Sequence, residues 1–131
     1  GMGLADPAWS AFAVLIVLYL ITAFLTEVLS NNATIVIMAP IALELAPLID
    51  AYRGLAELAP MGPDLARALV LASCVAASAS FITPIGYQTN TFVYTVGGYR
   101  FRDFMKIGIF FNLIYFVGTV LMVSLIWDLI P

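Results

Sequence analysis

The chain alternates between long apolar segments and short polar stretches, and this pattern predicts membrane helices. The apolar segments comprise residues 8–29, 33–49, 65–82 and 107–127. Because an α-helix rises about 1.5 Å per residue, about 20 apolar residues cross the hydrocarbon core of a bilayer. The first and last segments are long enough for a full span. The second contains Pro40, Glu44 and Pro47 and is a marginal span.

Composition excludes a soluble domain. The 131 residues are 63% hydrophobic and 10% charged, against about 45–50% apolar and about 25% charged residues in an average soluble protein. Disorder is excluded as well, because disordered chains combine low hydrophobicity with high charge. The mean hydropathy of +1.07 therefore predicts an all-α protein embedded in a lipid bilayer.

Charge and residue content exclude several functions. The net charge is −3 and no basic run occurs, so we do not expect a nucleic-acid partner. The sequence has no histidine and one cysteine, which excludes an intrachain disulfide, a Cys/His zinc site and a histidine-based catalytic triad. The aspartates all fall at segment ends, so no pair of acids lies at membrane depth. We therefore expect neither an enzyme nor an organic cofactor.

The basic residues predict the orientation. Arg100, Arg102 and Lys106 cluster between the third and fourth segments, whereas the connection over residues 50–64 carries only Arg53. Short loops rich in Lys and Arg stay in the cytoplasm. The 99–106 loop is therefore expected inside, and the 50–64 loop and the C-terminus outside.

The connection between the first two segments allows two topologies. It consists of the polar residues Ser30, Asn31 and Asn32 and carries no Lys or Arg, as a cytoplasmic turn between two full spans would. The alternative is a re-entrant hairpin over residues 8–49 that opens outward and ends at membrane depth. Irregular backbone at that depth is tolerated only when protein buries it or when it lines a watery cavity. The missing basic residues favour the hairpin.

The third segment is rich in Ala and Ser, which let helix backbones approach closely in lipid, so we expect it at the centre of a bundle. It runs into Thr83, Pro84 and Gly86, and a short apolar piece follows over residues 91–96. The pattern predicts a broken helix over residues 65–98. A last transmembrane helix is expected over residues 104–130.

The two polar breaks, residues 30–32 and 83–90, carry the candidate chemistry. Their carbonyl, hydroxyl and carboxamide oxygens can replace the water shell of a small cation, and N–H groups at the start of a following half-helix favour an anion. Paired interruptions near the midplane indicate the binding site of a secondary transporter. Each break alone is also typical of plain punctuation, because Ser-Asn-Asn is a good helix N-cap and Thr-Pro a common helix stop.

Both breaks resemble one family. The run LTEVLSNNATIVIMAPIALELA resembles the second hairpin of divalent-anion/sodium symporters, whose tip usually reads Ser-Asn-Thr, so that Asn32 replaces the Thr. The run ASFITPIGYQTNTFVYTVGGYRFRDFMKIG resembles their broken helix, and the variant TPIGYQTN is most similar to sodium/sulfate-symporter-like permeases. The resemblance implies that residues 1–131 are the C-terminal part of an inverted-repeat transporter of the inner membrane. It also implies a missing N-terminal half and a homodimeric full-length protein.

Carried over residue by residue, the resemblance assigns two sets of contacts. The sodium site is expected to comprise Thr26, Ser30 and Asn31, with backbone oxygens near Leu29 and Ile82. The anion contacts are expected to be Ser30, Asn31, Asn32, Thr83, Pro84, Gly86, Gln88 and Asn90. For Glu27, a proton-coupling role and a structural hydrogen-bonding role are both open. Asn112 is expected to make an interhelical hydrogen bond.

The function implied is cation-coupled transport of a small divalent anion, sulfate or a dicarboxylate, with sodium, or alternatively protons, as the coupling ion. A channel, or a structural membrane subunit without coupled transport, is the other hypothesis.

Overall fold

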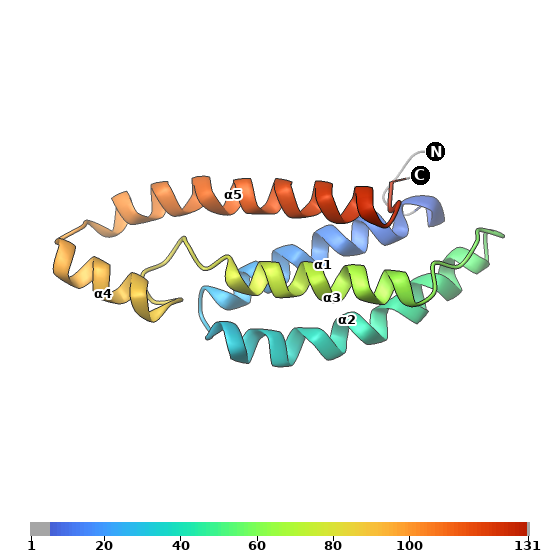
Figure 1. Cartoon of the computed structure of the whole chain (residues 1–131), viewed down its shortest axis with the longest axis horizontal. Coiled ribbons are helices and arrows are strands. Elements are labelled where there is room, and N and C mark those ends of the chain that lie inside the picture. The colour runs from blue at the N-terminus through green and yellow to red at the C-terminus, as the bar shows by residue number, and fades with distance from the viewer. Residues whose placement is uncertain (1–5, 131) are drawn as a thin grey trace.

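The computed structural model describes residues 6–130, which form a helical bundle (Figure 1). In chain order the elements are the 3-10 helix η1 (Pro7–Trp9), α1 (Ser10–Thr26), α2 (Asn31–Gly54), α3 (Pro63–Ser78), α4 (Gln88–Gly97) and α5 (Phe101–Ile126). Within residues 6–130, three helical stretches are long and apolar enough to cross a membrane: Pro7–Thr26, Asn31–Gly54 and Phe101–Ile126. The prediction of an all-α membrane protein is confirmed.

Helix α3 lies at the centre of the bundle, as its small residues predicted. It packs against α1, α2 and α5. Its buried side chains include Ala68, Ala72, Ala76 and Ala77, which are at most 2% exposed. Small side chains leave room for close backbone approach, and this replaces the hydrophobic drive that is weak between helices in lipid.

The second helix is longer than the sequence pattern predicted. A span over residues 33–49 and a loop over residues 50–64 were expected, but α2 continues through Pro40 and Pro47 to Gly54. Each proline removes one helical N–H donor, which membrane helices tolerate when neighbouring groups compensate. Asp50 binds the far end of the remaining loop: its carboxylate accepts hydrogen bonds from the N–H groups of Met61 (2.9 Å) and Gly62 (2.7 Å).

Other predicted boundaries also shift. Helix α3 ends at Ser78, and residues 79–87 (hereafter the interrupted segment) follow in irregular conformation. Helix α4 already includes the polar residues 88–90. The expected 99–106 loop is mostly helical, because α5 begins at Phe101, and the last helix ends at Ile126 rather than at residue 130. The tight link before α5 uses Gly98, whose φ of +62° is the left-handed conformation that favours glycine.

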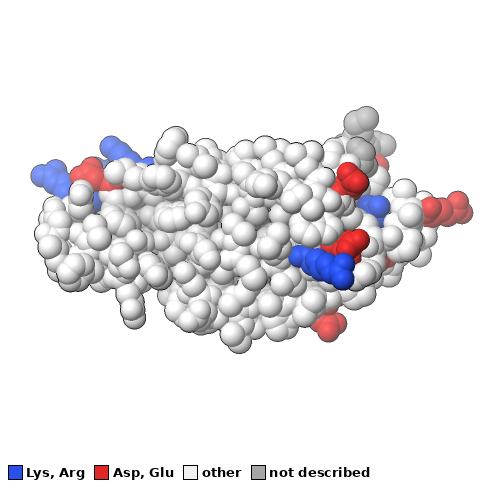
Figure 2. Space-filling view, viewed as in Figure 1, with Lys and Arg blue, Asp and Glu red and all other residues white. Residues whose placement is uncertain are grey.

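Charge is confined to the two ends of the face shown in Figure 2, and the surface between them is uncharged. Such a band is typical of a surface that contacts lipid or apolar protein. Along the same axis, the connection between α1 and α2 lies close to the level at which α3 ends, while α4 and the first turns of α5 extend beyond it (Figure 1). We call residues 27–32 the hairpin tip.

We predict that Ala76→Leu disrupts the bundle. Ala76 is fully buried on the helix that contacts three others, and overpacking a filled site typically costs about 1–3 kcal/mol. The melting temperature and the monodisperse yield of the full-length protein should both fall. Cys74→Leu, on the same helix but at an exposed position, adds a large side chain without displacing this core and serves as the control. Equal losses in the two variants would contradict a central role for this face of α3.

Candidate functional site

The two polar breaks meet in space. A cavity of about 480 Å³ lies between the hairpin tip and the interrupted segment. Its lining comprises Val28, Leu29, Ser30, Asn31, Asn32, Ile85, Gly86, Tyr87 and Gln88. Five of the residues predicted to contact the anion are among them, and no carboxylate, ammonium or guanidinium group is. We call this space the tip cavity.

Two helix N-termini adjoin the tip cavity. Helix α2 begins at Asn31, and Ser30 caps it: the Ser30 hydroxyl accepts a hydrogen bond from the N–H of Ala33 (3.2 Å). Helix α4 begins at Gln88, and its N-cap residue Tyr87 provides no side-chain cap. The first N–H groups of a helix lack partners within the helix and carry partial positive charge. The cavity is therefore suited to an anion although it contains no basic side chain.

Oxygen atoms converge beside the tip cavity, where three helix ends meet. The hydroxyl oxygen of Thr26, which is fully buried, lies 2.8 Å from Oδ1 of Asn31 and 2.5 Å from the backbone oxygen of Ala77. One hydroxyl proton cannot serve both acceptors at once. Hard cations take oxygen ligands of this kind. Of the other predicted sodium ligands, Leu29 lines the tip cavity, whereas Ile82 lines a separate, mainly apolar cavity between α1 and α5.

Glu27 joins the hairpin tip to the interrupted segment. Its carboxylate, 8% exposed, accepts hydrogen bonds from the N–H of Ile82 (2.9 Å), the N–H of Thr83 (2.7 Å) and the hydroxyl of Thr83 (2.9 Å). Nδ2 of Asn112 on α5 donates to the same carboxylate (3.2 Å). These contacts are the structural role that the sequence left open for Glu27. They also provide the interhelical hydrogen bond expected of Asn112.

Three predicted anion contacts lie away from the lining of the tip cavity. Thr83 faces Glu27, and its hydroxyl also accepts a hydrogen bond from the N–H of Gly86 (3.3 Å). Pro84 is buried. Asn90 donates through Nδ2 to the backbone oxygen of Ser80 (2.7 Å) and lines a different cavity, next to α5.

Sequence reasoning missed two groups at the site. The hydroxyl of Ser80 donates to the backbone oxygen of Thr26 (3.2 Å), which closes the interrupted segment over the hairpin tip. The backbone oxygen of Ala77 faces Thr26. Ser80 stood in a run of small residues that also predicted close packing, and a backbone oxygen has no sequence signature. Neither residue could have been identified without the pairing of the two breaks.

The apolar helical stretches and the paired helix ends within one bundle are typical of a multi-pass membrane protein of the transporter type. The chain belongs to the sodium:sulfate symporter family: the profile described as "Sodium:sulfate symporter transmembrane region" matches residues 4–131. This confirms the resemblance drawn from the two motifs. The family is one of transporters, not of enzymes.

Individual relatives agree with this assignment. A protein of Synechocystis sp., described as an uncharacterized transporter, is 48% identical over 122 residues, which cover 93% of this chain and 18% of that protein. The sodium/sulfate cotransporter 1 of Chlamydomonas reinhardtii is 42% identical over 73% of this chain and 9% of its own length. The sodium-dependent dicarboxylate transporter SdcS of Staphylococcus saprophyticus is 26% identical over 87% of the chain and 20% of its own. The chain thus spans a fifth or less of these relatives.

We predict that Gly86→Ala destabilises the site through Ser80. A Cβ at position 86 would lie 1.9 Å from the Ser80 hydroxyl oxygen and 3.0 Å from the backbone oxygen of Thr26. The hydroxyl must therefore leave its acceptor, and overpacking of this kind costs about 1–3 kcal/mol. The melting temperature of the full-length protein should fall in Gly86→Ala.

Removing the obstructing hydroxyl tests the cause. In a Ser80→Ala background, the same Gly86→Ala change should lower the melting temperature by much less. If the two substitutions lowered the melting temperature additively, the contact between position 86 and the Ser80 hydroxyl would be contradicted, because the effects of independent sites add. Gly118→Ala is the control, because apart from its chain neighbours and the backbone of its own helix no described atom lies within 4 Å of the corresponding Cβ position.

Proposed function

We propose that this chain is the C-terminal part of a sodium-coupled secondary transporter for a divalent anion, sulfate or a dicarboxylate. The observation that carries the proposal is the convergence of two helix N-termini, those of α2 and α4, on an uncharged polar cavity. The family supports transport of such anions, and the names of the Chlamydomonas and Staphylococcus relatives supply the two candidate substrates.

Helix N-termini fit a dianion without a costly buried base. Backbone N–H groups donate hydrogen bonds and contribute partial positive charge, and they need no counter-ion when the site is empty. The carboxamides of Asn31, Asn32 and Gln88 add further N–H donors. A site built in this way binds an oxyanion more weakly than an arginine pair would. Weak binding suits a carrier, because a transported anion must also leave.

The oxygen cluster around Thr26 supports a coupling cation next to that anion. Asn31 belongs to both groups of atoms: its Oδ1 faces Thr26, while the residue also lines the tip cavity. A sodium ion at Thr26 would lie close to the anion and reduce its desolvation cost. The two ligands would therefore stabilise each other, which is the requirement for coupling.

Helix geometry supports a re-entrant hairpin. Asn112, which contacts Glu27 in the hairpin tip, lies 11 residues after Phe101 and 14 before Ile126. At about 1.5 Å per residue these separations are about 17 and 21 Å, so the tip is level with the middle of α5. The tip would then lie near the bilayer midplane if α5 spans.

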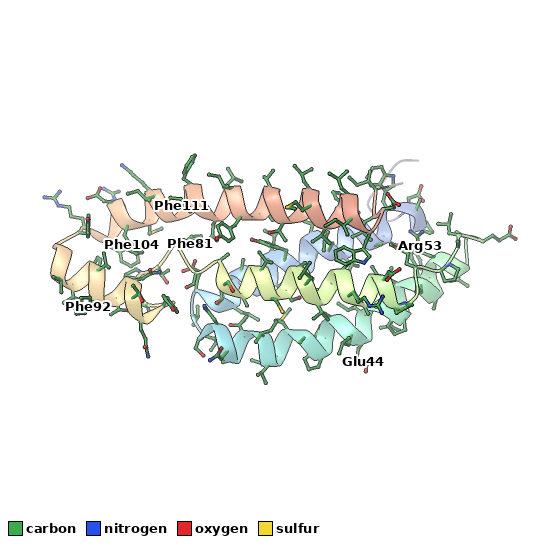
Figure 3. All side chains as sticks on the ribbon, in the orientation of Figure 1. Glu44, Arg53, Phe81, Phe92, Phe104 and Phe111 are labelled. Carbon is green, nitrogen blue, oxygen red and sulfur yellow. The ribbon has the colours of Figure 1, made fainter. Side chains whose placement is uncertain are left out.

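The position of Glu44 also supports a hairpin tip near the bilayer midplane. It lies in the middle of α2, is exposed, and projects away from α3 (Figure 3). Thirteen residues separate it from Asn31, which is about 20 Å along the helix. A tip at the cytoplasmic surface would leave this carboxylate inside the roughly 30 Å of hydrocarbon, at high cost. A tip at the midplane carries it to the outer interface.

The remaining parts of the proposal concern the whole protein. The basic residues Arg100, Arg102 and Lys106 support an orientation in which the start of α5 is cytoplasmic and the loop after α2 and the end of α5 are outside. The inverted-repeat architecture requires a first hairpin and a first broken helix from the preceding part of the full-length protein. We propose that the complete transporter is a homodimer in the inner membrane.

The re-entrant topology predicts protection of the hairpin tip. In the full-length protein with Cys74→Ala, single cysteines placed by Ser30→Cys or Asn32→Cys should not react with bulky, membrane-impermeant thiol reagents added from the cytoplasm. Arg102→Cys, at the start of α5, should react from that side and is the positive control. Free reaction at positions 30 and 32 from the cytoplasm, whether or not sodium and anion are present, would indicate two full spans.

Substitutions at and beside the hairpin tip should distinguish sodium binding from anion binding. Asn31→Ala is expected to weaken sodium and anion together, since an unpaired buried partner costs about 1–3 kcal/mol. Thr26→Ala should raise the sodium concentration needed for half-maximal uptake at saturating anion, and Thr26→Ser, which keeps the hydroxyl, should change it little. The measurement is uptake of labelled sulfate and succinate by the full-length protein in proteoliposomes, titrated with sodium.

The same assay tests specificity and the proposal as a whole. Asn32→Thr restores the more usual tip of the family and should shift the preference from sulfate toward succinate. Sodium dependence that is unchanged in both Thr26→Ala and Asn31→Ala would remove the hairpin tip from the cation site. Anion flux that rises linearly with concentration and never saturates would favour a channel.

A further inference from the structure

Helix α5 contacts the proposed site at three points on one side. The first is Gly108, which is buried against the interrupted segment: a Cβ there would lie 2.0 Å from the backbone oxygen of Phe81 and 2.7 Å from Cα of Ile82. Because these neighbours are backbone atoms, no side-chain movement can make room. The absence of a side chain at position 108 therefore sets how closely α5 approaches the interrupted segment.

The second point is the ring of Phe81. Its centroid lies 6.0 Å from that of Phe111 and 5.0 Å from that of Tyr115, both on α5. Figure 3 shows Phe81 and Phe111 together between the interrupted segment and α5. The Phe81–Tyr115 pair is edge-to-face and the Phe81–Phe111 pair is tilted, and offset ring pairs of this kind are favourable beyond their buried area. They anchor a stretch of chain that has no helical hydrogen bonds of its own.

The third point is Asn112, one helical turn beyond Gly108, which donates to Oε1 of Glu27 (3.2 Å). The other donors to this carboxylate belong to Ile82 and Thr83. Within residues 6–130 the one ion pair joins Arg67 to Asp64, so no Lys or Arg neutralises Glu27 there. Asn112 is therefore the one side chain outside the interrupted segment that is seen to hold this buried charge in the described structure.

The amide of Asn112 is held in one orientation. Its Oδ1 is buried and has no hydrogen-bond partner in the described structure, a state that costs free energy. In the opposite orientation that oxygen would face the Glu27 carboxylate, and the two oxygens would repel each other. Asn112 thus keeps an unpaired oxygen so that its N–H group can contact Glu27. A residue that served only to pack helices would not need this arrangement.

We propose that Asn112 is a positioning residue for anion binding: it fixes the carboxylate of Glu27, which in turn fixes the backbone of Ile82 and Thr83. Thr83 accepts from the N–H of Gly86, which lines the tip cavity next to the start of α4. Asn112 thereby sets the spacing between the two helix N-termini across the cavity. This role rests on the function proposed above and makes α5 part of the binding unit.

The test is a double-mutant cycle on the full-length transporter in proteoliposomes. Asn112→Ala should raise the KM for sulfate roughly tenfold at saturating sodium, about 1.4 kcal/mol, which is near the lower end for loss of one hydrogen bond to a charged group, and should lower Vmax less. If Asn112 acts through Glu27, the KM of Asn112→Ala with Glu27→Ala should equal that of Glu27→Ala alone. Ser124→Ala, a buried polar position on α5 that is remote from Glu27, should leave KM unchanged.

KM does not depend on the amount of active protein, so partial misfolding does not obscure the result. Asn112→Ser, whose hydroxyl is too short to reach Glu27, should reproduce the effect if the alanine variant is made poorly. A wild-type KM in both Asn112 variants, or multiplicative effects in the double variant, would overturn the proposal.

The melting temperatures of the same proteins test the contact between Asn112 and Glu27 independently of transport. Asn112→Ala should lower the melting temperature of the wild type but not that of Glu27→Ala, whatever the protein transports. If wild-type protein takes up neither sulfate nor succinate in a saturable, sodium-dependent way, the proposed function is wrong and the positioning role is rejected with it. Saturable wild-type uptake with Asn112→Ala behaving like Ser124→Ala would reject the positioning role alone.

Discussion

The structure around the interrupted segment depends on one buried carboxylate. Glu27 lies where α1 ends and accepts hydrogen bonds from two backbone N–H groups of a stretch that has left its helix. In lipid such N–H groups have no water to bind and cost several kcal/mol each when they are unpaired. The carboxylate of Glu27 thus stabilises the irregular backbone of the interrupted segment, and the N–H groups of that segment stabilise the buried carboxylate.

Sequence alone predicted the elements better than it predicted their contacts. Composition and segment length indicated membrane helices, because a span needs about 20 apolar residues. The small residues of α3 indicated its central position, because close helix packing in lipid needs small side chains. The ends were less predictable. Pro47 suggested an early stop for α2, but the helix continues to Gly54, since tertiary contacts can compensate a lost N–H donor.

The candidate site could be predicted only as two separate motifs. Residues 30–32 and 83–90 were identified because polar runs in apolar surroundings are costly, and both contribute to the tip cavity. Their division of labour was not predictable. Thr83 faces Glu27, and Asn90 binds the Ser80 backbone. Which side of an irregular segment faces a cavity depends on its backbone torsions, and these follow from distant contacts such as that of Asn112 with Glu27.

The neutral lining of the tip cavity has a consequence for acidity. Peptide groups and carboxamides neither gain nor lose protons in the physiological range, and the sequence has no histidine, the one side chain that ordinarily titrates there. The lining therefore presents the same donors in mildly acidic and in neutral surroundings. A change of occupancy with pH would arise outside the lining, in the bound molecule or in a group behind the lining. Of the two anions proposed above as substrates, sulfate keeps both charges on mild acidification, whereas a dicarboxylate begins to acquire a proton, so acidity would shift the competition between them.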